Sequence, residues 1–187
     1  MNITSPISIC SNALLLLGHT PISSFDEAGS GAQVASNLYE SSYRNLLSLH
    51  RWRFATKTAR LSRLTTTPPH SYQYMFQLPS DLIMVINIEG NNQIFEIYGD
   101  KLYTNDSDVY LDYIYRVDES FLPPWFTKTM EFFLAMQFAI PVTGNSTRAG
   151  EYSGFYEAQL KRAKNIDSSE RTNISIISSP FTEVRHG

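Results

Sequence analysis

The residues of this chain best suited to metal binding or covalent catalysis are one cysteine, Cys10, and the histidines His19, His50, His70 and His186. No histidine lies three to five residues from another histidine or from Cys10, which is the spacing typical of zinc sites. Cys10 falls on an apolar stripe of helical spacing, so we predict a packed, inert thiol and not a nucleophile. The sequence predicts neither a metal site nor a catalytic cysteine.

Two short segments resemble ligand-binding loops. The run from Gly29 to Gly31 precedes a predicted helix and could hold a phosphate, but no Lys-Ser or Lys-Thr follows it, which favours a helix-entry hinge. Asp100, Asp106 and Asp108 resemble a loose calcium loop without its later glycine and glutamate, which favours a solvated hairpin turn. We therefore expect no enzyme activity and no cofactor. An active site assembled from distant residues stays open as an alternative.

Basic and aromatic residues alternate between residues 51 and 63. The aromatic residues are Trp52 and Phe54, and the bases of this basic strip are Arg51, Arg53, Lys57, Arg60 and Arg63. Bases beside aromatic rings can hold phosphates and stack on nucleobases. The isoelectric point of about 5.8 is unlike that of a free DNA-binding domain. We predict a protein interface or a solvated strand face, and a nucleic-acid-binding module that uses the strip is the alternative function.

Charge is segregated along the chain, although the net charge is only −3. Residues 1–40 hold three acids and no lysine or arginine, and residues 41–80 hold six bases and no acid. Residues 81–120 then hold nine acids and two bases. Such blocks favour faces of opposite sign, which suits side-to-side packing of identical subunits, with the acids of 81–119 as expected partners of the strip. A solvated surface is the other interpretation.

Hydrophobic periodicity predicts helices at about 5–17, 31–50, 124–140 and 146–166, with short strands between 55 and 118. The expected fold is α+β, a four-helix core with a small antiparallel β insertion between helices two and three. Leu14, Leu46, Trp125, Phe132 and Met136 are predicted to be buried. Residues 1–187 form one expected domain, with the β insertion at 55–118 and a flexible C-terminal tail at 168–187.

Composition excludes several other classes of protein. Apolar residues make up 42% and charged residues 18% of the 187 residues, as in a globular chain. The longest purely apolar runs have five residues, which is too short for a membrane-spanning helix. Collagen, coiled-coil rod, zinc-finger and disulfide-knot structures do not fit this composition.

The order and spacing of several short motifs resemble the tail tubular protein A family, the head-to-tail adaptors of tailed bacteriophages. The resemblance covers about residues 5–165, and no single motif is diagnostic. It rests on Ile9–Gly18, Pro21–Glu27, Ala35, Leu38–Tyr39, Leu46–Leu47, His50–Ala55, Leu78–Leu82 and the helix pair after Pro123.

This resemblance implies a structural, non-enzymatic protein of the virion, made in the host cytoplasm and located at the head–tail junction. Such adaptors form a homo-oligomeric ring of twelve copies beneath the portal protein. The ring receives the tail nozzle, tubular protein B, or a tail tube, and it leaves a channel through which genomic DNA passes without sequence-specific binding. Their fold is described as a helical bundle with a β insertion.

The tail contains apolar residues that a purely solvated segment does not need. Ile174 and Ile176 alternate with polar residues in a strand-like pattern, and Ile177 and Phe181 follow. We expect the tail to be disordered alone and to become ordered against the portal or a neighbouring subunit. These four residues therefore join the five bases of the strip as candidate interface residues.

Overall fold

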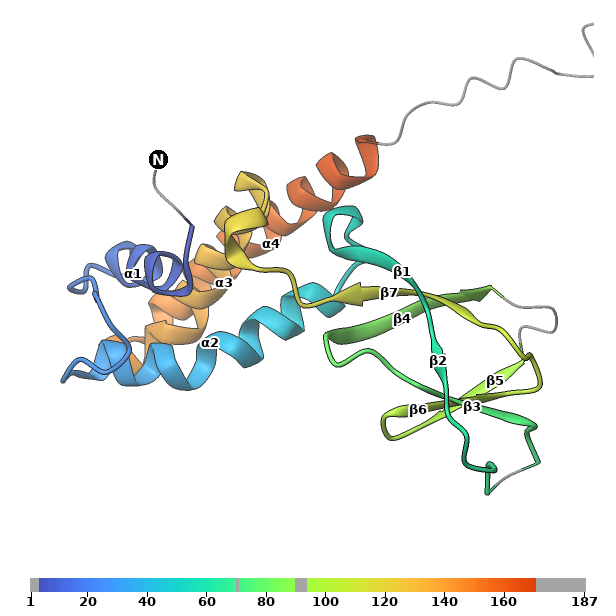
Figure 1. Ribbon diagram of the computed structural model, residues 1–187. Coiled ribbons are helices and arrows are strands. Elements are labelled where there is room, and N and C mark those ends of the chain that lie inside the picture. Colours follow the sequence, from blue (N-terminus) through green and yellow to red (C-terminus); the bar gives the residue numbers. More distant parts are fainter. Residues whose placement is uncertain (1–3, 70, 90–93, 171–187) are drawn as a thin grey trace, which may run out of the picture.

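The computed structural model describes residues 4–69, 71–89 and 94–170. Within these residues the chain is α+β, with a helical part and a β part that lie next to each other (Figure 1). The helices are α1 (Pro6–Leu16), α2 (Ser30–Ser48), α3 (Pro124–Thr143) and α4 (Ser146–Ser169). Two short 3-10 helices, η1 (Arg53–Ala55) and η2 (Glu119–Phe121), lie where the chain enters and leaves the β part.

Local capping interactions set the helix ends. The Ser5 side chain accepts the Ser8 backbone N–H in a capping box, and Pro6 occupies the first turn of α1. Asn145 caps α4 by accepting the N–H groups of Thr147 and Arg148. The third helix was expected to end near 140, but it continues through Pro141. It ends where Gly144 adopts a left-handed φ of 65° that favours glycine.

The β part consists of two antiparallel sheets. The strands are β1 (Thr56–Arg60), β2 (Ser62–Arg63), β3 (Tyr74–Gln77), β4 (Leu82–Glu89), β5 (Phe95–Tyr98), β6 (Lys101–Thr104) and β7 (Tyr110–Tyr115). The first sheet has the order β1-β7-β4, and the second has the order β2-β3-β6-β5. In the first sheet, β1 pairs with β7 from Thr56 opposite Ile114 to Arg60 opposite Tyr110. The chain therefore enters and leaves the β part on neighbouring strands.

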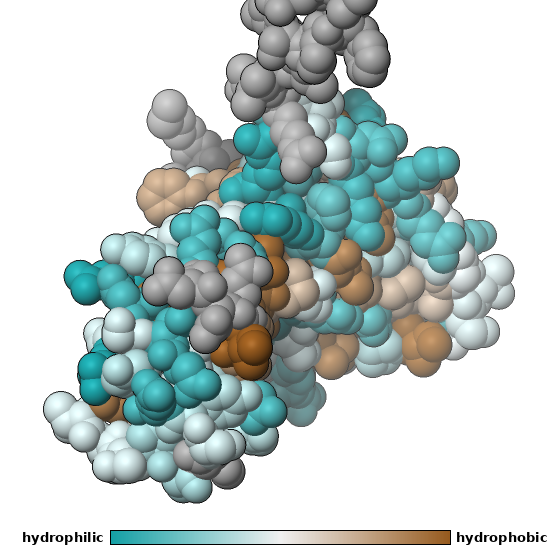
Figure 2. Space-filling model, turned by 90° about the vertical axis from the view of Figure 1, so that its right-hand side faces the viewer, coloured by the Kyte–Doolittle hydropathy of each residue, from teal (hydrophilic) through white to brown (hydrophobic). Residues whose placement is uncertain are grey.

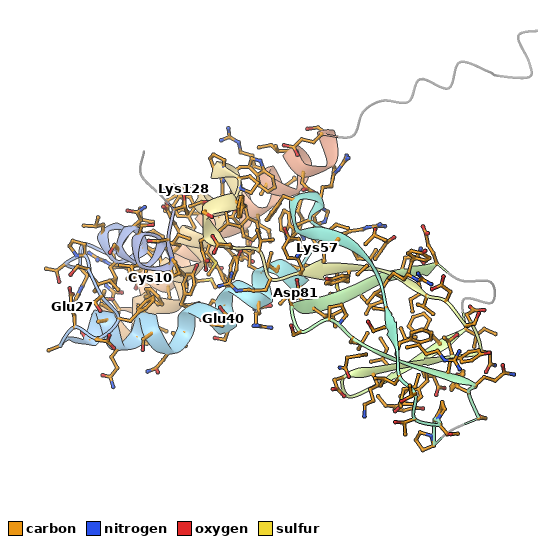
Figure 3. The ribbon with its side chains drawn as sticks, viewed as in Figure 1. Cys10, Glu27, Glu40, Lys57, Asp81 and Lys128 are labelled. Carbon is orange, nitrogen blue, oxygen red and sulfur yellow. The ribbon has the colours of Figure 1, made fainter. Side chains whose placement is uncertain are left out.

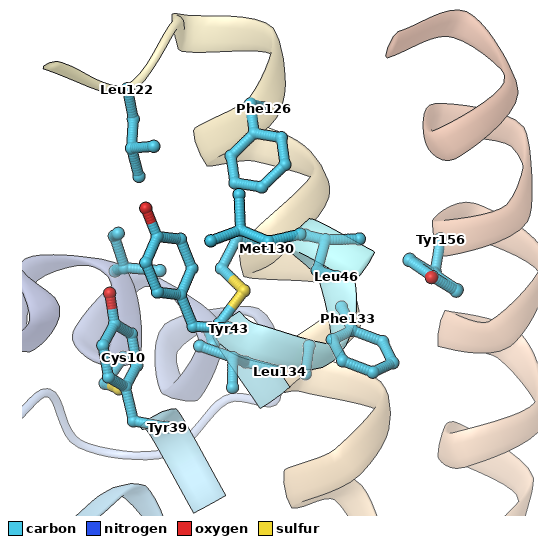
Figure 4. Close-up of a cluster of buried hydrophobic side chains, with 14 of the residues drawn as sticks. Cys10, Tyr39, Tyr43, Leu46, Leu122, Phe126, Met130, Phe133, Leu134 and Tyr156 are labelled. Carbon is cyan, nitrogen blue, oxygen red and sulfur yellow. The ribbon is translucent and has the colours of Figure 1, made fainter. Parts of the chain in front are cut away.

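Each part has its own hydrophobic core. Figure 4 shows the core of the helical part, where Tyr43 and Leu46 of α2 meet Phe126, Met130 and Leu134 of α3. The other core lies between the sheets and consists of Leu61, Phe76, Leu78, Ile88, Leu102, Val109, Leu111 and Tyr113. Strand β7 contributes to both cores, because its alternating side chains point to opposite faces of the sheet.

The expected four-helix core with a small β insertion is wrong. The β part has seven strands in two sheets among the described residues, and it encloses a core of its own. The core of the helical part is also completed by residues outside the four helices, namely Trp52, Ala55, Ile114, Val117 and Leu122. Sequence periodicity identifies short strands one at a time, but it does not show that strands far apart in the chain pair into two sheets.

The buried face of α3 also differs from the expectation. Leu14 and Leu46 are fully buried as predicted, but Trp125, Phe132 and Met136 are only half-buried. The neighbouring stripe, which contains Phe126, Met130, Phe133, Leu134 and Phe138, is buried instead. Because α3 is apolar on most sides, its own periodicity does not select the face that packs against α2 and α4.

Candidate functional site

The basic strip does not form one continuous surface in the structure. Lys57 lies 3.1 Å from the Asp81 carboxylate and 3.6 Å from the centre of the Tyr115 ring. Arg60 lies 2.7 Å from Asp108. For these two bases, the acids expected from a neighbouring chain are thus supplied by the same chain. These two ion pairs balance the charges of Lys57 and Arg60 at the centre of the strip, so they divide it into two separate ends.

The other three bases of the strip lie at its two ends. The Arg63 guanidinium lies 4.1 Å from the centre of the Tyr74 ring. Arg51 and Arg53 line a pocket of about 680 Å³ where the end of α2, the start of β1 and the last turn of α4 meet, with His50, Thr56, Asp167 and Ser168. Among the described residues, no carboxylate lies within ion-pair distance of the Arg51 or Arg53 guanidinium.

Asp167 forms the floor of this pocket. Its side chain is almost fully buried, and Oδ1 accepts the backbone N–H of Arg53 at 3.0 Å. Its Oδ2 lies 3.3 Å from Nε2 of His50, whose ring packs edge-on against Trp52. Both carboxylate oxygens are therefore occupied, and two cationic side chains remain at the pocket rim. This arrangement can bind an anionic group.

Sequence reasoning missed Asp167, Thr56 and Ser168 as partners of the strip. A signal for Asp167 was nevertheless present. Tyr156, Leu160 and Ala163 recur at helical spacing and pack in the core, and Asp167 continues that spacing one turn later. An acid on an apolar stripe indicates a buried polar contact, but the sequence does not name the partner.

A second polar cluster joins α2 to the segment between β7 and α3. The Arg116 guanidinium contacts Glu40 at 2.9 Å and Glu119 at 2.7 Å, and it lies 4.0 Å from the centre of the Tyr43 ring. Partial burial acts to raise the pKa of Glu40, but hydrogen bonds from Arg116 and Arg44 outweigh it and hold that pKa below its ordinary value. The cluster is closed by contacts within the chain, which indicates a structural role.

The candidate catalytic and metal-binding features have structural roles. Cys10 is fully buried, as predicted. Burial raises its pKa to about 12, so the thiol stays protonated near neutral pH. Gly29 caps the start of α2. Asp108 pairs with Arg60, and the Asp100 side chain accepts from Gln77. In the part of the chain that the structure describes, no three histidine, cysteine or acidic residues gather where a metal ion could bind.

The four apolar candidates of the tail, Ile174, Ile176, Ile177 and Phe181, lie outside the described residues. In the described segments, no helix combines the length and apolar character needed to cross a bilayer. Neither a comparison with models of protein families nor one with curated proteins finds a match for the chain.

Proposed function

We propose that this chain is a structural head-to-tail adaptor of a tailed bacteriophage, which forms a ring of twelve copies between the portal and the tail nozzle or tube. The observation that carries the proposal is the ordered series of motifs that resembles the tail tubular protein A family. These motifs occupy defined positions in the fold. The block from His50 to Ala55 connects the helical and β parts, and the turn before Leu82 holds Asp81, which pairs with Lys57.

The surface of the helical part supports a protein with several partners. Four of its large apolar side chains in the described residues are more than half exposed, namely Leu15, Phe121, Ile140 and Phe155. Apolar and aromatic side chains of this size supply much of the binding energy at protein interfaces. By contrast, the face seen from the β end is mostly hydrophilic, and its apolar side chains lie in separate small patches (Figure 2).

Nucleic-acid binding through residues 51–63 is the weaker candidate. Lys57 and Arg60, at the centre of the strip, already pair with carboxylates of the same chain. A protein that follows a phosphate backbone needs a continuous series of available cations.

The proposal is tested in virions of the phage that carries the gene. Antibodies against the chain should label the head–tail junction, and the full chain mixed with the portal protein of the same genome should form a ring of twelve 21.3 kDa subunits. Labelling elsewhere in the virion, or strong salt-dependent binding of free DNA without a ring, would contradict the proposal.

The C-terminal tail is the proposed contact with the portal or an adjacent subunit. A chain that lacks residues 171–187 should keep the helices and sheets described above, because both hydrophobic cores are built from residues 9–163. It should bind the portal ring more weakly than the full chain in a pull-down assay. Equal binding of both forms would exclude a docking role for the tail.

A further inference from the structure

The two ends of α2 carry opposite charge. Asp26 and Glu27 lie in the exposed turn that precedes the helix, in a 40-residue segment without lysine or arginine. Arg51 and Arg53 follow the other end of the helix, at the junction with the β part. With 19 residues, α2 separates the two sites by about 27 Å at 1.5 Å per residue. Figure 3 shows Glu27 at the end of the helical part that is far from Lys57 and Asp81.

The basic pocket is built to accept a small acidic group. The Asp167 carboxylate is already held by His50 and by the Arg53 backbone N–H, so it does not pair with the arginine side chains. The guanidinium groups of Arg51 and Arg53 are matched to carboxylates in geometry as well as in charge. Lys57, the next base of the strip, is paired with Asp81 and does not extend the pocket along the strip. Two arginine side chains at one pocket suit one or two carboxylates.

The acidic turn is held in a defined shape. The Glu27 carboxylate accepts the Ser23 backbone N–H at 3.0 Å and also the Ser23 hydroxyl. These hydrogen bonds from Ser23 hold the pKa of Glu27 below its ordinary value, so its charge persists in mildly acidic solution. The Ser24 hydroxyl in turn accepts the Asp26 backbone N–H at 3.1 Å. Two adjacent exposed acidic residues therefore lie in a turn that needs little ordering on binding.

We infer that the Asp26–Glu27 turn of one copy docks into the Arg51–Arg53 pocket of the next copy. The inference rests on the proposed ring and names the contact that closes it. Because the acidic turn and the basic pocket lie at opposite ends of the same helix, the contact is heterologous and repeats from copy to copy, as a ring requires. Both sites stay on the surface of the isolated chain, which explains why two arginines without an ion pair among the described residues line a pocket there.

The test uses the full chain with reversed charges at either site. Arg51→Glu/Arg53→Glu reverses the pocket, and Asp26→Arg/Glu27→Arg reverses the turn. Lys161→Glu/Arg162→Glu is the matched control, because it reverses two exposed bases of α4 that do not line the pocket and that form no ion pair within the described residues. Self-association is measured by sedimentation of each protein up to millimolar concentration, alone and with the portal ring. Circular dichroism checks that each variant is folded.

Each reversal should weaken self-association at least roughly tenfold, the effect expected for loss of close charge pairs, while the control should change it much less. An equimolar mixture of the pocket-reversed and turn-reversed chains should recover association, because each then offers the charge that the other lacks. The uncharged variant Arg51→Gln/Arg53→Gln should show a smaller loss of self-association. It still tests the pocket if a glutamate beside Asp167 disturbs the fold of the charge-reversed chain.

Association of the pocket-reversed chain that equals that of the control would overturn the inference. So would a mixture that fails to recover, since another group would then occupy the pocket. Loss of salt-dependent DNA binding with unchanged self-association would assign the pocket to nucleic acid. In these cases the wild-type ring still forms and the proposed adaptor function stands. A wild-type chain that forms no ring in either state contradicts both proposals.

Discussion

The Tyr39 hydroxyl donates a hydrogen bond of 2.8 Å to the Glu119 carboxylate across 80 residues of sequence. Glu119 is buried, and Arg116 also contacts it, so a phenol and a guanidinium share one carboxylate. The contact fixes α2 to the chain that leads from the β part into α3. It therefore helps to set the position of the β part on the helices.

Replacement of Tyr39 by phenylalanine should lower the free energy of unfolding by about 1–3 kcal/mol, because a buried carboxylate loses one of its donors. Urea denaturation monitored by tryptophan fluorescence measures the loss. Tyr43→Phe serves as the comparison, because it removes a hydroxyl that donates to an uncharged acceptor, the Val117 carbonyl. A Tyr39→Phe protein as stable as the wild type would show that the Tyr39 contact adds nothing.

Replacement of Arg116 by methionine should be more costly, about 3–5 kcal/mol, since it leaves Glu119 buried without a cation. Glu40→Gln is the matched control, because the Glu40 side chain is 50% exposed and its pair with Arg116 is open to water. That control should cost less than about 1 kcal/mol. Equal losses in the two variants would contradict the assignment of Glu119 as the critical partner.

Two phenylalanines of α3 should respond differently to truncation. Phe126 is fully buried between α2 and the Trp52 ring, and Phe126→Ala should cost about 3–5 kcal/mol. Phe132 is half-buried beside Lys128 and Phe155, so Phe132→Ala should cost clearly less. Chemical denaturation of both variants measures the difference. A larger loss at position 132 would mean that the packing of α3 is assigned to the wrong face.

Stability should fall as the solution becomes alkaline. The pKa of Cys10 is raised from its ordinary 9.0 to about 12 by burial, so above pH 9 the unfolded chain releases a proton that the folded chain retains. The stability associated with this group is complete below pH 9 and is lost at up to about 1.4 kcal/mol per pH unit as the pH rises toward 12. Burial of Tyr39 and Tyr43 raises their pKa values and acts in the same direction.

Cys10→Ala isolates the contribution of the thiol. Urea denaturation at several pH values between 8 and 10 should give a shallower decline for this variant than for the wild type, whatever its stability at neutral pH. Identical slopes for the two proteins would show that Cys10 ionises equally in the folded and unfolded chains.

The helices could be predicted from the sequence because their ends are set by neighbouring residues. Ser5 and Pro6 start α1, and Asn145 starts α4, each through contacts within a few positions. The predicted range of 55–118 also contains all the strands of the described residues, which run from Thr56 to Tyr115. These features depend on local propensity and capping, which a single sequence contains.

The division into two sheets and the basic pocket depend on long-range contacts. Thr56 pairs with Ile114, and Arg53 contacts Asp167 from 114 positions away. No pattern near one partner specifies the other. The bases of the strip can thus be read from the sequence, whereas their division into paired bases and pocket bases became visible only in three dimensions.

The presence of two cores affects how the protein loses its structure. The outer sheet, β2-β3-β6-β5, can separate from the rest without exposing Trp52, Tyr43 or Phe126, which lie in the other core. Such a molecule has two cooperative units, and amide protons of the outer sheet can exchange with solvent through partial opening while those of α3 require global unfolding. Under load, one unit can thus deform while the other keeps its contacts.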